Sequence, residues 1–154
     1  MNHDHYSDDY LCKILARTHT VALVGASARD DRPSHWVLGF LLGKGYQVFP
    51  VNPALAGTTI LGRPVHARLA DIGVPIDLID VFRRSESLSE VVDEALALER
   101  RPKAIWGQLG VRDDDAAAKA EAAGIDVVMN RALVAEYPLV YQASHIAHRS
   151  PTAA

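Results

Sequence analysis

Apolar runs alternate along this chain with segments whose apolar residues recur at helical spacing, and this alternation constrains the fold more than any other feature. The apolar runs span residues 20–26, 46–51, 77–82, 103–107 and 125–129. Such runs are typical of strands buried on both faces, as in a parallel sheet. Helical spacing predicts helices over residues 7–17, 35–44, 87–99, 113–123 and 132–136. The sequence therefore predicts an α/β fold, a doubly wound parallel sheet of five strands with helices on both faces.

Polar residues next to the predicted helices indicate where each helix begins. Ser34 is expected to cap the second helix, Ser87 or Ser85 the third, and Asp113 or a neighbouring acid the fourth. Residues 52–73 are rich in glycine and proline and predict an irregular crossover, with one turn of helix near residues 67–71. Residues 144–154 are expected to form a loose tail.

Length and charge bound the domain organisation and the partners. A chain of 154 residues fits one domain, with a core over about residues 10–140 and flexible ends. Sixteen Lys and Arg against 19 Asp and Glu give a net charge of −3 without a basic run, so no nucleic-acid partner is expected. No apolar stretch approaches the roughly 20 residues of a membrane span, and the polar, acidic start does not resemble a signal peptide. A cytoplasmic location is expected.

Cysteine and histidine usage argues against a disulfide or a metal site. Cys12 is the one cysteine of the sequence and is expected to pack on the first helix. Four histidines lie near the ends of the chain and are interpreted as solvated, namely His3, His5, His145 and His148. Trp36 and Trp106 are expected in the core or in the wall of a groove, with Trp36 on the inner face of its helix.

The segments that follow the predicted strands carry the candidate binding residues, because ligands of open parallel sheets lie outside the carboxyl ends of the strands. Gly25 permits a sharp turn, and the helix that follows presents a positive N-terminus, which suits a phosphate. Arg29 and Arg32 in this loop, and Arg83 with Arg84 after the third strand, add the fork geometry that matches phosphate oxygens. A tight turn with solvated surface arginines is the alternative interpretation.

The dinucleotide fingerprint and a catalytic set are both absent from these segments. The fingerprint requires glycine at positions 25, 27 and 30, whereas the chain has Gly25, Ser27 and Asp30. The second strand ends at Asn52 instead of at an acid that would hold a ribose hydroxyl, which disfavours NAD. Neither Ser27 nor Ser34 has a histidine and an acid placed with it in a recognisable pattern. The sequence therefore describes a protein that holds a ligand.

Five blocks of sequence carry a resemblance to a known family. They are Val24-Gly-Ala-Ser27, the nine residues from Gly45 to Pro53, Asp80-Val-Phe-Arg-Arg84, Trp106-Gly-Gln-Leu-Gly110 and Val128-Met-Asn-Arg131. With these blocks in order over about residues 10–140, the chain resembles the single-domain CoA-binding proteins, which are similar to the N-terminal CoA-binding domain of the succinyl-CoA synthetase alpha subunit. The resemblance implies a Rossmann-like fold with strand order 3-2-1-4-5 that binds coenzyme A.

The resemblance also implies a set of binding residues. Gly25, Ala26 and Ser27 are expected to face the diphosphate, and Val51, Asn52 and Pro53 the adenosine. Phe82, Arg83 and Arg84 are expected to line the groove beside the third strand, with Gln108 and Gly110 at its far side. Arg29, Arg32 and Ser34 are expected to reach the ribose phosphate or the diphosphate.

Two departures from the family pattern limit the expected activity. Relatives often carry cysteine where this chain has Ala132, so no thiol chemistry is assigned there. The second domain of the synthetase has no counterpart in the sequence, so ligase activity is not expected. The leading hypothesis is non-catalytic binding of CoA or acyl-CoA. A small enzyme that transfers or hydrolyses acyl groups, and an NAD(H)-responsive interaction domain, are the alternatives, and a homo-oligomer or a protein partner is left open.

Overall fold

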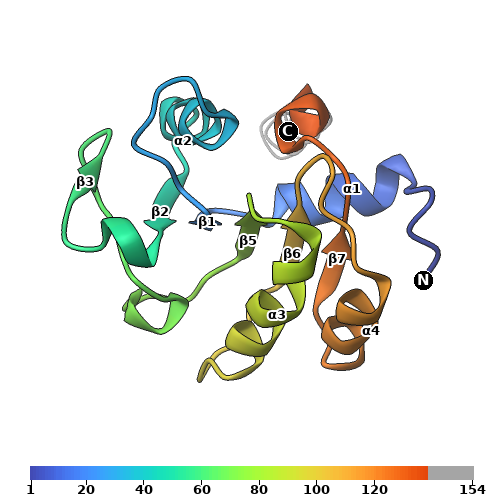
Figure 1. Cartoon of the computed structure of the whole chain (residues 1–154). Helices are drawn as coiled ribbons and strands as arrows, with labels where there is room; N and C mark the ends of the chain where they lie inside the picture. The colour runs from blue at the N-terminus through green and yellow to red at the C-terminus, as the bar shows by residue number, and fades with distance from the viewer. Residues whose placement is uncertain (139–154) are drawn as a thin grey trace, which may run out of the picture.

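A five-stranded parallel sheet forms the centre of the computed structural model, which describes residues 1–138 (Figure 1). Its strands are β1 (Thr20–Val24), β2 (Gln47–Val51), β5 (Leu78–Val81), β6 (Ala104–Gly107) and β7 (Asp126–Val128). The four helices named alongside them are α1 (Asp8–Ala16), α2 (Pro33–Gly43), α3 (Leu88–Leu96) and α4 (Asp114–Ala122). Every pairing within this sheet is parallel. The predicted α/β, doubly wound, Rossmann-like fold class is confirmed.

Helices cover both faces of the sheet because successive strand residues point to opposite sides. In β1, Val21 and Leu23 pack with residues of α1 and α2, whereas Ala22 and Val24 pack with residues of α3 and α4. β1 is buried along four of its five residues, as the continuous apolar run predicts. Trp106 of β6 is fully buried on the α1 and α2 side, where its indole N–H donates to the carbonyl of Arg131 at 2.9 Å.

The expected strand order 3-2-1-4-5 is wrong. The order is β2-β1-β5-β6-β7, which is 2-1-3-4-5 when the five strands are numbered along the chain. The outer edge of β2 is occupied by the crossover itself. The N–H of Asn52 donates to the carbonyl of His66 at 2.9 Å, and the N–H of His66 donates to the carbonyl of Pro50 at 3.0 Å. Because this segment makes hydrogen bonds with the backbone groups at the outer edge of β2, the third strand, β5, pairs with β1 on the side away from β2.

The crossover between β2 and β5 contains more structure than the sequence predicted. Besides the expected turn of helix, η2 (Leu69–Asp71), it holds η1 (Pro53–Leu55) and a two-stranded antiparallel hairpin of β3 (Thr59–Ile60) and β4 (Arg63–Pro64). Residues 133–138 are helical, in keeping with the predicted last helix. The predicted tail over residues 144–154 lies outside the described residues.

Helix starts agree with the sequence in one case and differ in two. The Asp113 side chain accepts from the N–H of Ala116 and caps α4 as expected. Ser34 does not cap α2, because the helix begins at Pro33, two residues before the expected start, and the ring of Pro33 presets the backbone for the first helical position. α3 has no side-chain cap, since a turn of 3-10 helix, η3 (Ser85–Ser87), leads directly into it.

The N-terminal segment packs against the domain, so the interpretation of His3 as solvated is wrong. His3 is buried and makes hydrogen bonds to the hydroxyl of Tyr6 at 2.7 Å and to a carboxylate oxygen of Glu121 at 2.8 Å. The Tyr6 hydroxyl accepts from the N–H of Met129 at 2.8 Å. These contacts bring residues 3–6 against the end of β7. Within residues 1–138, no helix is long and apolar enough to cross a membrane.

Candidate functional site

A crevice opens where the chain leaves the neighbouring strands β1 and β5. The chain turns from β1 towards α2 on one face of the sheet and from β5 towards α3 on the other face (Figure 1). The connections therefore diverge at the carboxyl edge, which is the topological switch point of a sheet of order 2-1-3-4-5. The strand order differs from the expected one, yet a pocket lies at the edge of the sheet where the site was predicted.

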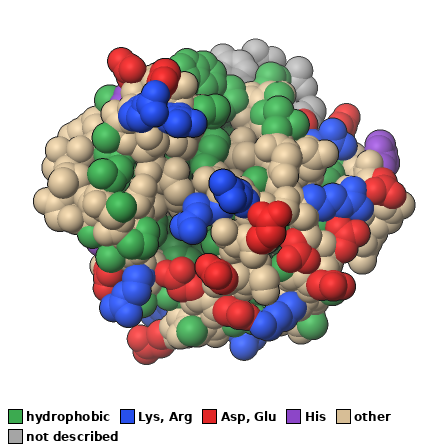
Figure 2. Space-filling view, viewed as in Figure 1, with side chains coloured by type: hydrophobic (Ala, Val, Ile, Leu, Met, Phe, Trp, Pro, Cys, Tyr) green, Lys and Arg blue, Asp and Glu red, His purple; other side chains and the backbone are tan. Residues whose placement is uncertain are grey.

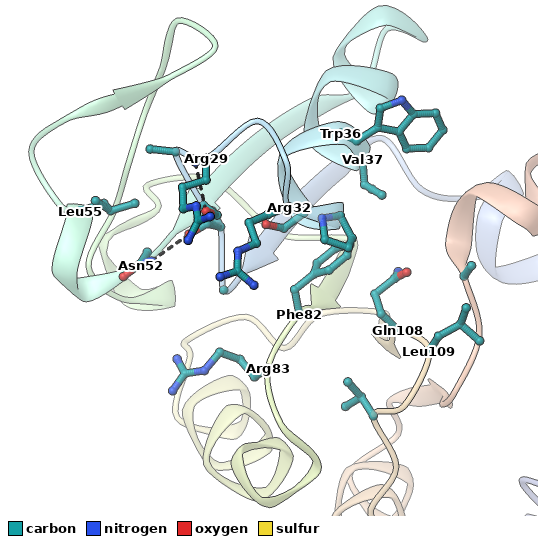
Figure 3. Close-up of a pocket in the computed structure, with 18 of the residues that line it drawn as sticks. Arg29, Arg32, Trp36, Val37, Asn52, Leu55, Phe82, Arg83, Gln108 and Leu109 are labelled. Carbon is teal, nitrogen blue, oxygen red and sulfur yellow. Dashed lines mark hydrogen bonds between the residues drawn. The ribbon is translucent and has the colours of Figure 1, made fainter.

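A pocket of about 860 Å³ lies in this crevice (Figure 3). It is lined by the loops after β1, β2, β5 and β6, by the first residues of α2, and by residues 132 and 134 next to β7. A volume of this size is within the range of pockets for small molecules and cofactors, about 300–1,000 Å³. The predicted site residues among its lining are Gly25, Ala26, Ser27, Arg29, Arg32, Ser34, Asn52, Phe82, Arg83 and Gln108.

The turn after β1 requires glycine. Gly25 has a φ of +89°, and a Cβ added there would lie 2.2 Å from the carbonyl oxygen of Phe82. The N–H groups of Gly25 and Ala26 both donate to the carbonyl of Val51, at 3.0 and 3.3 Å. The Asn52 side chain braces the same turn by donating to the carbonyl of Ala26 at 2.8 Å. The turn therefore brings three loops together, while its first two amides are held by the protein itself.

Three arginines give the pocket its charge. Arg29, Arg32 and Arg83 line it, and the described lining residues include no aspartate or glutamate. Arg29 pairs with Asp31 at 2.9 Å in the exposed loop, whereas Arg32 extends into the space between Asn52 and Phe82 (Figure 3). Arg83 lines the pocket from the loop after β5, a strand that pairs with β1. Positive charge without an opposing carboxylate in the lining suits a polyanionic ligand.

The N-terminus of α2 contributes less than the sequence suggested. Pro33 has no N–H, and the N–H groups of His35 and Trp36 donate to the carbonyl of Arg32 at 3.1 and 3.3 Å. Ser34, expected to reach a phosphate, is buried at the edge of the pocket with 4% of its surface exposed. The arginine side chains therefore supply most of the capacity for binding an anion, together with the positive end of the helix dipole.

Gln108 forms part of the pocket wall, and a hydrogen bond to a residue of β5 holds its side chain in place. Its Nε2 donates to Oδ1 of Asp80, a residue of β5 that is fully buried. Burial raises the pKa of the Asp80 carboxyl to about 7, which the hydrogen bond from Gln108 opposes. Oδ2 of Asp80 is also buried and has no hydrogen-bond partner among the described residues. With its Nε2 engaged, Gln108 keeps its Oε1 as the acceptor that a ligand could reach.

Four predicted site residues lie outside the pocket lining, namely Val51, Pro53, Arg84 and Gly110. Val51 is buried, and its carbonyl holds the turn after β1. Pro53 is the exposed first residue of η1, and Arg84 precedes η3. Gly110 lies in the loop after β6 and ties it to two neighbouring segments. Its N–H donates to the side chain of Asn130, and its carbonyl accepts from the hydroxyl of Ser85.

Other lining residues were not predicted from the sequence as binding residues. Leu55, Leu109 and Val134 are among them. Trp36 forms a wall of the pocket with 58% of its surface exposed, so its expected place on the inner face of α2 is wrong. The apolar residues of α2 extend around much of the helix, which leaves its inner face undefined by spacing alone. For Leu109, the available signal is an apolar residue between Gln108 and Gly110 in a polar loop.

The chain belongs to the family described as the CoA binding domain, whose model matches residues 19–138. It is 37% identical over 118 residues to the uncharacterised protein YneT of Bacillus subtilis (strain 168), covering 77% of this chain and 84% of YneT. A solved structure of a hypothetical protein from Pyrococcus horikoshii OT3 has 33% identity and a TM-score of 0.82, over 90% of this chain and 94% of that one. The family expected from the five sequence blocks is confirmed.

A more distant structure shares the fold alone. A dinucleotide-forming acetyl-coenzyme A synthetase of Ca. Korarchaeum cryptofilum is 20% identical, with a TM-score of 0.57, over 71% of this chain and 25% of the synthetase.

Within the described residues 1–138, no three His, Cys, Asp or Glu side chains are grouped so that they could hold a metal ion.

Proposed function

We propose that this protein binds coenzyme A or an acyl-CoA in the pocket at the carboxyl edge of β1 and β5, without transforming it. The observation that carries the proposal is the convergence of Arg29, Arg32 and Arg83, from two connections far apart in the sequence, on a pocket whose described lining has no acid. Coenzyme A carries a diphosphate and a ribose phosphate, and forked guanidinium groups match phosphate oxygens. Membership of the CoA-binding domain family supports the same ligand.

The pocket also fits the other parts of coenzyme A. Gly25 lines the pocket without a side chain, so a ligand can lie against the backbone there. Asn52 and Leu55 bound the pocket beside β2 and offer a wall for the adenosine. Gln108 lies on the other side, towards β6, and its Oε1 can accept a hydrogen bond from an amide of the pantetheine arm.

A binding role without catalysis is supported by the side chains around the pocket. The described lining residues include no histidine, cysteine, aspartate or glutamate, which are the usual general bases and activated nucleophiles. The hydroxyl of Ser27 accepts from the N–H of Arg29, and Ser34 is buried. Acetyl-CoA incubated with the protein is expected to release free thiol at the rate of the buffer alone, and a faster release would refute a purely binding role.

Calorimetric titration with CoA, using two neighbouring arginines, tests the site. Arg83→Ala is expected to weaken CoA binding by about 1.5–3 kcal/mol, or tenfold to a hundredfold, because a charge-assisted hydrogen bond is lost. Arg84→Ala is the matched control, since Arg84 is outside the pocket lining, and its effect should stay below twofold. Titration with 3′-dephospho-CoA shows which phosphate Arg83 contacts. Absence of heat and of a thermal shift with CoA, or equal effects of the two variants, would overturn the proposal.

A further inference from the structure

The pocket is divided into a charged half and an apolar half. Asn52, Arg29, Arg32 and Arg83 lie towards β2 and α3, whereas Trp36, Val37 and Leu109 lie on the opposite side, with Phe82 between the two groups (Figure 3). The apolar half is completed by Ala132 and Val134, next to the helix of residues 133–138. Figure 2 shows hydrophobic side chains along the hollow between α2 and this last helix, with Lys or Arg side chains at its lower end.

The apolar half exposes more hydrophobic surface than its position requires. Trp36 is 58% exposed and Leu109 69% exposed, and both border the same cavity. Neighbouring exposed side chains of this size are uncommon on a soluble protein unless they bind something. One turn further along α2, Phe40 contacts Tyr137 with ring centroids 5.2 Å apart, and neither residue belongs to the pocket lining. Apolar contact between the two helices thus continues beyond the cavity.

The polarity of this half decides which part of the ligand it suits. Its described side chains offer one polar group, the indole N–H of Trp36, and the half is bordered by the amide of Gln108, whose Nε2 is already bonded to Asp80. An adenine ring carries several nitrogen atoms that need partners once they leave water, whereas a hydrocarbon chain needs none. In an acyl-CoA, the acyl group is separated from the diphosphate by the pantetheine arm, so phosphates in the charged half place the acyl group on the other side of Gln108.

We infer that the apolar half is an acyl subsite, and that the protein prefers acyl-CoA thioesters with an unbranched apolar acyl chain over free CoA. This inference rests on the proposed function, since the phosphates must occupy the arginine half first. In the bound state, the acyl chain of the ligand covers Trp36 and Leu109 and lies along Val37 and Val134. An acyl chain that ends in a carboxylate gains no affinity there, because the described residues of this half include no cation that could pair with the carboxylate.

Affinities for a series of ligands test the inference. Calorimetry with CoA and with acetyl-, butyryl-, hexanoyl- and octanoyl-CoA is expected to show affinity rising by up to about fourfold for each added CH₂, until the subsite is filled. Succinyl-CoA is expected to bind no more tightly than acetyl-CoA. If no ligand of the series binds, the proposed function fails together with the inference. If CoA binds and the affinity is independent of chain length, the inference alone is overturned.

Variants then locate the subsite. Leu109→Ser is expected to reduce the gain from acetyl-CoA to octanoyl-CoA at least tenfold and to leave the affinity for free CoA within twofold. Val74→Ser, at an exposed apolar residue outside this pocket, is the matched control and should change neither. Trp36→Ala provides a second test, which also serves if the Leu109 variant does not fold. Should it weaken free CoA and octanoyl-CoA equally, the indole contacts the adenine instead, and the assignment of the acyl subsite is wrong.

Discussion

Asp80 makes the stability of this protein depend on pH in a direction opposite to that of most carboxylates. It lies in the central strand β5, is fully buried, and has a single hydrogen-bond donor, Gln108, on one of its oxygens. Burial raises the pKa of this carboxyl from 3.8 to about 7, because the charged form loses its hydration. The native protein therefore keeps a proton on Asp80 at pH values where the unfolded chain has released it.

The sign and the size of the effect follow from this difference in pKa. Between pH 3.8 and about 7 the native state binds one more proton than the unfolded state, so the free energy of unfolding falls as the pH rises and becomes level above pH 7. At about 1.4 kcal/mol per pKa unit, the full loss is about 4 kcal/mol. Between pH 5 and pH 8, where Asp80 contributes most of its change, the loss is about 2–3 kcal/mol.

The variant Asp80→Asn isolates this contribution, because asparagine has the same shape and does not titrate. We expect its free energy of unfolding to exceed that of the wild type by about 2–3 kcal/mol more at pH 8 than at pH 5. Urea unfolding at intervals of one pH unit, followed by tryptophan fluorescence, measures both proteins. Taking the difference between the two proteins removes every pH-dependent contribution that they share.

Asp77→Asn is the control for this experiment. Burial acts to raise the pKa of Asp77, but hydrogen bonds from the N–H groups of His19 and Thr20 and from Lys103 lower it overall. Asp77 is ionised in both states above pH 5, so its variant should differ from the wild type by a constant amount between pH 5 and pH 8. If Asp80→Asn also differs from the wild type by a constant amount, Asp80 is ionised in the native state and the reasoning is refuted.

Two further predictions concern the framework of the site. Gly25→Ala is expected to destabilise the protein by at least about 2 kcal/mol, because its Cβ meets the carbonyl of Phe82, whereas Gly124→Ala, at a similar φ with open space around it, should cost about 1 kcal/mol. Equal effects in thermal unfolding would show that the close approach to Phe82 is unimportant. Tyr6→Phe leaves the N–H of Met129 without its partner and should cost about 1–3 kcal/mol in urea unfolding. An unchanged stability would mean that the N-terminal segment does not dock in solution.

Local chemistry explains why much of the fold could be predicted. Most residues of the five strands are buried, so each strand is visible as an apolar run, and Asp113 caps α4 where a polar residue precedes a helical pattern. The strand order could not be read in this way. Whether β5 pairs with β1 or with β2 depends on the route of the crossover, and the bonds between Asn52, His66 and Pro50 that close the edge of β2 have no signature in the sequence.

The candidate site, like the fold, could be predicted from the sequence only in part. Because the strands were predicted to be parallel, the loops that follow them were expected to meet at one edge of the sheet. The sharp turn after β1 explained the need for glycine there. Tertiary structure alone decided which neighbour takes part: Arg83 lines the pocket and Arg84 does not, and Trp36 is exposed at its wall.

The sequence by itself determined the strands, most of the helices, the edge of the sheet at which the pocket lies, and the family. Only the tertiary structure decided the strand order, the bond between Asp80 and Gln108, and the division of the pocket into a charged and an apolar half. The physical reason is the range of the interactions involved. Backbone preference and burial act on neighbouring residues and leave a pattern in the sequence, whereas contacts between strands and loops depend on where the whole chain has been placed.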